Sequence, residues 1–229
     1  MKVAVIQMTC TIGDKNANFE KAAPMIEEAC QNGAKLIVLP ELFNTGYCCR
    51  DDWALAETGN DKTYEFLKYY TVKYDTSIMA GFIERSNVPG LVYNSVMYVH
   101  KNEKAKIYRK MYLWGAEKNR FIRGEELSVW KSDGINTAAQ ICYEVGFSEN
   151  ARMLTFGGAE IICYSAAFGR ARGYAWDLAT RARALENGCF VLASNHSSDE
   201  EGLEFCGMSR IVNTKGEVIA EATKDNEVV

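Results

Sequence analysis

Proline and histidine are scarce in this sequence of 229 residues, which contains 3 prolines and 2 histidines. The few prolines, together with the lack of repeats, low-complexity segments and linkers, predict one compact domain over residues 1–229. Because only His100 and His196 are available and no H-E-x-x-H motif occurs, we expect no catalytic metal. No G-x-S-x-G motif is present, so a serine hydrolase of that type is not expected either.

Long apolar runs are lacking too, since none reaches the roughly 18–20 residues that cross a bilayer. The apolar opening over residues 1–8 is too short for a signal peptide, and we expect no membrane partner. The net charge of -4 gives no indication of a nucleic-acid partner. The 8 cysteines contain no C-x-x-C pair, so we expect free thiols in a reducing, cytoplasmic environment.

Apolar runs typical of buried strands alternate with segments whose apolar residues have helical spacing. Strands are expected over residues 2–8, 34–39, 77–84, 136–143, 160–164 and 189–195. Helices are expected over residues 18–32, 63–74 and 173–187, with a short one between the strands at 136–143 and 160–164. Hairpins are expected over residues 91–108 and 208–221. The pattern predicts an α/β fold with a mixed sheet or sheets covered by helices.

Two reactive side chains stand where predicted strands end, which is where α/β folds gather functional groups. Glu41 follows the apolar run L-I-V-L-P and is a candidate general base, with an N-cap or a loop ion pair as the structural alternative. Cys142 ends the run T-A-A-Q-I-C before a turn whose N–H groups could hold an oxyanion, with a core cysteine as the alternative. His196, after V-L-A-S-N, is the one histidine that could approach such a site as a base.

Six segments, in this order along the chain, resemble the nitrilase superfamily of carbon–nitrogen hydrolases. They are K-V-A-V-I-Q-M, L-I-V-L-P-E-L-F-N-T-G-Y, Y-R-K-M-Y-L, Q-I-C-Y-E-V-G-F-S-E, R-A-R-A-L-E-N-G-C-F-V-L-A-S-N and G-M-S-R-I-V-N-T-K-G-E-V-I-A-E-A. The resemblance implies a four-layer α-β-β-α sandwich that forms one carbon–nitrogen hydrolase domain. The chain ends at Val229, where members of the family usually continue, so we expect a short or truncated C-terminal tail.

The resemblance also implies a catalytic set without a cofactor. Cys142 matches the nucleophile, Glu41 the general base and Lys110, in Y-R-K-M-Y-L, the cation that meets the oxyanion. Glu117, in L-W-G-A-E-K-N-R-F, matches a second acid that is expected to fix Lys110 or the substrate. The expected substrate-binding residues are Tyr47 and Phe168, which match pocket positions, and Tyr143, whose backbone N–H faces the oxyanion.

Three charged residues within the matching segments are expected to have a structural role. Arg183 and Glu186 lie three residues apart on a predicted helix and should form an ion pair. Glu144 is expected to point away from the nucleophile, because adjacent residues of a strand face opposite sides of the sheet.

The expected reaction is hydrolysis of a small amide with release of ammonia through a cysteine thioester. An N-carbamoyl amine hydrolase and a nitrilase are the alternatives within the family, whose members usually form homodimers or larger assemblies. A non-catalytic interaction module is an alternative from another class. A thiol redox enzyme is a further one, with Cys163 as the only candidate resolving cysteine.

Overall fold

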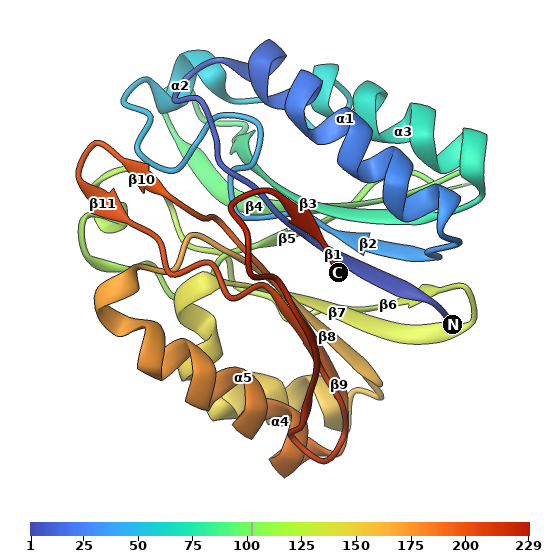
Figure 1. The fold of residues 1–229 in the computed structure, drawn as a ribbon. Helices are drawn as coiled ribbons and strands as arrows, with labels where there is room; N and C mark the ends of the chain where they lie inside the picture. Colours follow the sequence, from blue (N-terminus) through green and yellow to red (C-terminus); the bar gives the residue numbers. More distant parts are fainter. Residues whose placement is uncertain (102) are drawn as a thin grey trace.

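Two six-stranded sheets lie face to face, and helices cover the outer side of each (Figure 1). The computed structural model describes residues 1–101 and 103–229. The helices α1 (Lys15–Gln31) and α3 (Lys62–Tyr74) form one outer layer. The helices α4 (Ser148–Phe156) and α5 (Gly173–Asn187) form the other. The fold is therefore the four-layer α-β-β-α sandwich that the resemblance implies.

The first sheet has parallel strands at its centre and antiparallel strands at its edges. Its order is β14 (Glu227–Val228), β1 (Val3–Gln7), β2 (Leu36–Val38), β3 (Ser77–Arg85), β4 (Val92–His100) and β5 (Lys106–Arg109). Successive residues of its strands face opposite sides: Val5 and Val38 point to the core between the sheets, and Ile6 and Ile37 pack under α1 and α3. Because both faces are buried, these strands are continuous apolar runs.

The second sheet repeats this plan with parallel strands β7, β8 and β9 at its centre. Its order is β13 (Val218–Glu221), β12 (Arg210–Val212), β9 (Phe190–Asn195), β8 (Ile161–Ala166), β7 (Ile135–Ile141) and β6 (Val129–Ser132). Buried hydroxyl groups join the two sheets, since Ser165 Oγ donates to the Leu39 carbonyl at 2.5 Å and Ser194 Oγ to the Ile6 carbonyl at 2.6 Å. The first bond brings the ends of β2 and β8 together, and the second joins β1 and β9.

The structure corrects the predicted strand over residues 136–143, because β7 ends at Ile141. Cys142–Gly146 forms a 3₁₀ helix, η2, so Cys142 and Tyr143 are not strand residues. The strand β6 was not predicted, although the turn that joins it to β7 is Asp133-Gly134, both with positive φ. That dipeptide is a strong hairpin signal, so the sequence did contain the information.

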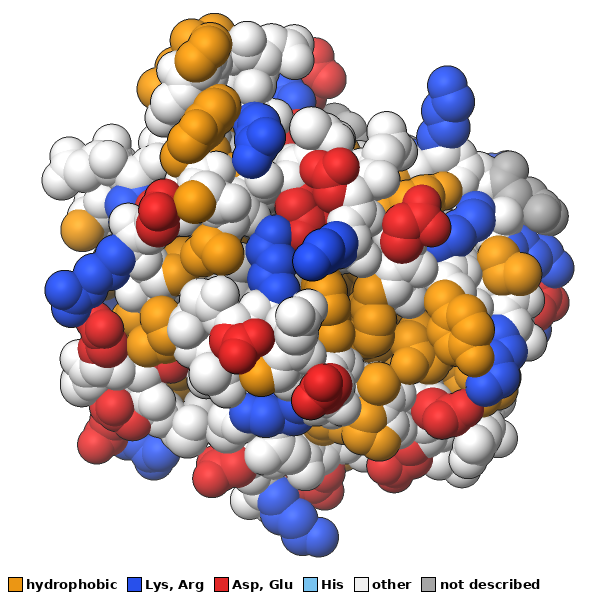
Figure 2. Space-filling model, turned by 90° about the horizontal axis from the view of Figure 1, so that it is seen from above, with side chains coloured by type: hydrophobic (Ala, Val, Ile, Leu, Met, Phe, Trp, Pro, Cys, Tyr) orange, Lys and Arg blue, Asp and Glu red, His pale blue; other side chains and the backbone are white. Residues whose placement is uncertain are grey.

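Several short elements were also not predicted, because tertiary contacts rather than long apolar patterns define them. They are α2 (Asp52–Leu55), η1 (Gly115–Asn119), η3 (Arg170–Arg172), β10 (Asp199–Glu200), β11 (Leu203–Glu204) and the pairing strand β14. No helix in the described part of the chain has the length and apolar character needed to cross a membrane. Viewed from the side of α1 and α3, acidic and basic side chains are interspersed over the surface (Figure 2).

Candidate active site

Glu41 is fully buried at the end of β2, and both of its carboxylate oxygens are hydrogen bonded. Oε1 accepts from Asn94 Nδ2 at 2.6 Å and from Lys110 Nζ at 2.7 Å. Oε2 accepts from the backbone N–H of Ala167, just beyond β8, at 2.8 Å. Three donors from three separate segments thus fix the position of one carboxylate.

The turn that carries Glu41 requires a glycine on the neighbouring strand β3. A Cβ atom on Gly81 would lie 2.5 Å from the Leu42 nitrogen and 2.6 Å from Glu41 Cα. Leu42 itself has a φ of 48°, in the left-handed region that side chains other than glycine rarely adopt. The close approach and the strained residue place Glu41 so that it points inward between the sheets.

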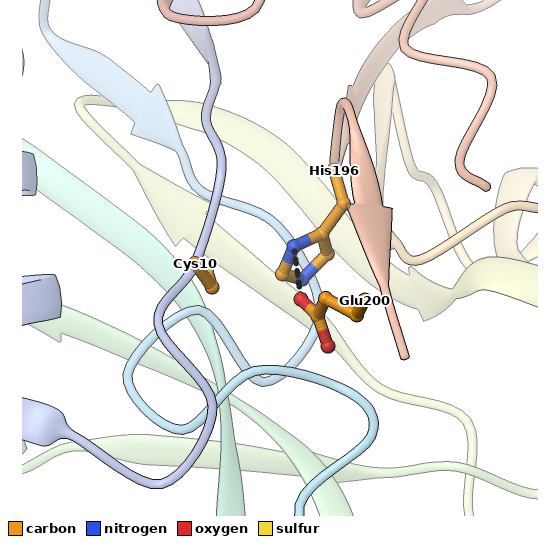
Figure 3. Close-up of side chains that lie close together, drawn as sticks. All are labelled: Cys10, His196 and Glu200. Atoms are coloured by element: carbon orange, nitrogen blue, oxygen red, sulfur yellow. Dashed lines mark ion pairs between the residues drawn. The ribbon is translucent and has the colours of Figure 1, made fainter. Parts of the chain in front are cut away.

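A cluster of the partly buried Cys10 and the buried His196 and Glu200 lies against the same turn (Figure 3). His196 Nε2 is hydrogen bonded to the Glu41 carbonyl oxygen, which can only accept, so Nε2 carries the hydrogen. Its other nitrogen, Nδ1, lies 3.4 Å from Glu200 Oε1. The two ring nitrogens therefore face Glu41 and Glu200, and the proposed use of His196 as a base for Cys142 is not supported.

Lys110 is fully buried just after β5, between two carboxylates. Its ammonium lies 2.7 Å from Glu41 Oε1 and 2.8 Å from Glu117 Oε1. Burial alone would lower the pKa of Lys110, but the charges of Glu41 and Glu117 outweigh it and raise the pKa well above its usual value. The two carboxylates therefore favour the charged form of Lys110 despite its burial.

Glu117, in η1, holds Lys110 from the other side. Its Oε1 accepts a second hydrogen bond from the Tyr47 hydroxyl at 2.7 Å, and its Oε2 accepts from the Trp114 backbone N–H at 2.8 Å. Tyr47, Glu117, Lys110 and Glu41 consequently form one continuous hydrogen-bonded chain.

Cys142 begins η2 with a φ of 48° and is 7% exposed. Burial raises the pKa of its thiol well above the usual value, and the charge of Glu41 adds to this effect. Lys110 and the Ala167 N–H oppose the increase without cancelling it. Burial thus favours the neutral thiol of Cys142 over the thiolate.

Glu144 fastens the turn at Cys142 to the loop of Lys110. Its carboxylate accepts from the Ile141 N–H at 2.7 Å, from the Met111 N–H at 2.7 Å and from the Tyr108 hydroxyl at 2.8 Å. Burial raises the pKa of Glu144 to about 7, although these hydrogen bonds act against the increase. The expectation that Glu144 is structural agrees with these contacts, but the reason given was wrong, since the residue lies on a 3₁₀ helix.

Arg183 supports the same turn from α5. It forms the expected ion pair with Glu186 at 2.6 Å. It also donates to the carbonyl oxygens of Val145 and Gly146 at 2.9 and 3.3 Å. The end of η2 is thereby tied to the helical layer.

A cavity of about 180 Å³ opens beside Cys142. Its walls include Tyr47, Tyr143 and Phe168, the three residues that were expected to contact substrate. They also include Trp114 and Arg172, which the sequence analysis did not identify. The cavity is smaller than the roughly 300–1,000 Å³ of sites for drug-sized ligands, so it suits a small molecule.

The four-layer sandwich and a buried cysteine beside a carboxylate and an ammonium group define a nitrilase-type hydrolase. The family model described as carbon-nitrogen hydrolase matches residues 2–229, and the chain belongs to this family. It is 33% identical to a nitrilase of Pyrococcus abyssi, over 100% of this chain and 87% of that protein. It is 32% identical to a 2-oxoglutaramate amidase of Bacillus subtilis, over 99% of this chain and 88% of that protein.

Solved structures share the fold. A Saccharomyces cerevisiae member of branch 10 of the nitrilase superfamily superposes with a TM-score of 0.91 at 26% identity, covering 99% of this chain and 88% of that one. An amidase of Nesterenkonia sp. AN1 superposes with a TM-score of 0.90 at 24% identity, covering 100% and 91%. The active-site cysteine of that amidase carries acrylamide as a Michael adduct.

The raised pKa of the Cys142 thiol leads to a testable prediction. Because the charge of Glu41 helps to raise the thiol pKa while Lys110 opposes it, Glu41→Gln should lower the pKa of Cys142. Ultraviolet titration of thiolate measures this shift after subtraction of the same curve for a Cys142→Ala variant in each background. An unchanged or higher pKa in Glu41→Gln would contradict the electrostatic account.

Proposed function

We propose that this carbon–nitrogen hydrolase cleaves a small amide with Cys142 as nucleophile, Glu41 as general base and acid, and Lys110 as the oxyanion-binding cation. The observation that supports this most is the fixed position of Glu41, whose oxygens bond Lys110 on one side and the Ala167 N–H on the other. Cys142 lies within the electrostatic influence of both Glu41 and Lys110. A nucleophile, a base and an oxyanion-binding cation are the parts that acyl transfer needs.

In the first half of the reaction, Glu41 accepts the Cys142 proton as the sulfur bonds to the amide carbon. The carbonyl electron pair moves to oxygen, where the Lys110 ammonium and the Tyr143 backbone N–H stabilise the negative charge. Glu41 then gives its proton to the nitrogen, the C–N bond breaks, and ammonia leaves. The acyl group remains on Cys142 as a thioester.

In the second half, Glu41 accepts a proton from a water molecule that attacks the thioester carbon. Collapse of this second tetrahedral intermediate breaks the C–S bond. The sulfur takes back a proton from Glu41, and the carboxylic acid leaves. Because one carboxylate serves both halves, it must stay fixed, which agrees with its three donors.

Glu117 has a positioning role in this proposal, because it contacts Lys110 and Tyr47. Tyr47, Tyr143 and Phe168 line the cavity and would enclose the substrate. We place a plain amidase first, an N-carbamoyl amine hydrolase second and a nitrilase third. Relatives of the chain carry the names nitrilase, 2-oxoglutaramate amidase and ω-amidase, which fits this range.

Two rival functions fit the site less well. A binding module has no need for a buried ammonium between two carboxylates beside a thiol, because burying such charges is costly. A thiol redox enzyme needs an accessible resolving cysteine, but Cys163 is buried in the core on β8, and burial raises its pKa.

Ammonia release from a panel of small amides, ω-amides, carbamoyl amines and nitriles tests the proposal. Cys142→Ala should lose about 10⁴-fold or more in kcat, because the nucleophile is removed. Cys163→Ala is the matched control and should keep its activity. Hydrolysis that survives in Cys142→Ala would contradict the assigned nucleophile.

We further propose that the outer face of α4 and α5 binds a second copy of this chain. These two helices expose five large apolar side chains, namely Met153, Phe156, Tyr174, Leu178 and Leu185. A patch of this kind on one layer is typical of a protein interface. Pairing through it would stack two sandwiches into the eight-layer dimer that family members usually form.

Sedimentation of the purified protein tests the dimer. Leu178→Glu places a charge in the proposed interface and should convert the dimer to a monomer. Tyr69→Glu, at an exposed aromatic residue of α3, is the control and should leave the mass unchanged. A monomeric wild type, or a dimer that Leu178→Glu does not weaken, would contradict the proposal.

We also propose the cytoplasm as the location. All 8 cysteines are unpaired, and the nucleophile needs a reducing environment. Fractionation of the source cells would test this, and recovery outside the cytoplasmic fraction would contradict it.

A further inference from the structure

Arg172 is an unassigned cation in the wall of the Cys142 cavity. It stands directly before α5 and is partly buried. Its guanidinium carbon lies 4.7 Å from the ring centre of Trp114, 5.8 Å from that of Phe168 and 6.0 Å from that of Tyr143. Three aromatic rings around one guanidinium stabilise its position by cation–π attraction.

This guanidinium has no acidic partner within the described residues, 1–101 and 103–229. Other arginines near the site do: Arg120 pairs with Asp52 at 2.8 Å, and Arg183 pairs with Glu186. Arg170, only two residues away, pairs with Glu204 at 3.0 Å. Among the described residues, Arg172 is thus a cation without an acidic partner, in the wall of the cavity that Cys142 also lines.

The buried charges behind the cavity wall act against an anionic substrate. Glu41, Lys110 and Glu117 together carry one net negative charge in a buried place. An anionic substrate would be repelled from these groups unless a second cation met its charge. A neutral substrate would need no such group, and an unpaired arginine in the wall would then serve no purpose in binding.

We propose that Arg172 binds a carboxylate of the substrate. The site then accepts amides that carry a carboxylate at the end of the molecule opposite the C–N bond that is cleaved. This inference rests on the proposed function and specifies its substrate class. Two kinds of molecule combine a cleavable C–N bond with a carboxylate in this way: monoamides of short dicarboxylic acids and N-carbamoyl amino acids. The size of the cavity, about 180 Å³, restricts both to short chains.

Steady-state kinetics on matched substrate pairs test the inference. One pair is a dicarboxylic monoamide and the uncharged alkyl amide of equal length; the other is an N-carbamoyl amino acid and the corresponding N-carbamoyl amine. In Arg172→Gln, kcat/KM for the carboxylate-bearing substrate should fall roughly 30-fold to 1,000-fold, mainly through KM, because the charge pair between Arg172 and the substrate carboxylate is lost. For the uncharged substrate of each pair, kcat/KM should change by less than about threefold. The pair that responds more strongly identifies the substrate kind.

Two further variants separate recognition from folding. Arg172→Lys keeps the charge without the planar fork and should recover part of the lost affinity. Arg170→Gln removes the neighbouring exposed arginine and should leave both substrates unaffected. A wild type that prefers the uncharged partners, or an Arg172→Gln variant that slows both partners equally, would overturn the inference.

Calorimetry separates this inference from the proposed function. Cys142→Ala cannot turn over substrate but should bind either a dicarboxylic monoamide or an N-carbamoyl amino acid, and adding Arg172→Gln should weaken that binding roughly 30-fold to 1,000-fold. Binding that depends on Arg172 in a protein without any hydrolase activity would uphold the inference and reject the function. Binding that is the same with and without Arg172 would reject the inference alone.

Discussion

The buried ammonium of Lys110 is the interaction on which the rest of the site depends. A lone charge at this depth would be strongly unfavourable, and the carboxylates of Glu41 and Glu117 offset that cost from two sides. The same contacts fix the direction of Glu41, whose second oxygen is held by the Ala167 N–H. In the proposed mechanism, this one buried charge fixes the position of the base and is itself the cation that meets the oxyanion.

The double-sheet architecture follows from the need to bring these groups together. Glu41 and Lys110 come from the first sheet, whereas Cys142 and the Ala167 N–H come from the second, so neither sheet alone contains the site. Residues with left-handed backbone conformation stand at both turns of the site: Leu42, directly after Glu41, and Cys142 itself. Such strain persists only where surrounding contacts determine the backbone, and Gly81 and Glu144 supply those contacts.

Much of this arrangement could be predicted from sequence, and the failures have physical causes. Apolar runs located the central strands, and Glu41 and Cys142 were found because they end two of them. The turn at Cys142 was read as strand, because its left-handed residue is imposed by tertiary contacts and not by a glycine. Trp114 and Arg172 were missed because they reach the cavity from loops and short 3₁₀ segments that have no periodic pattern. Their role depends on which distant residues lie beside them.

The central claim is that the acyl group of an amide passes through Cys142. Acid quenching of the wild-type enzyme during turnover, followed by digestion and mass spectrometry, tests it most directly. The account predicts an acyl adduct with the mass of the substrate's acid portion on the peptide that contains Cys142. An adduct on another cysteine, such as Cys206 or Cys163, or turnover without any covalent intermediate under conditions where hydrolysis of the thioester is slow, would contradict it.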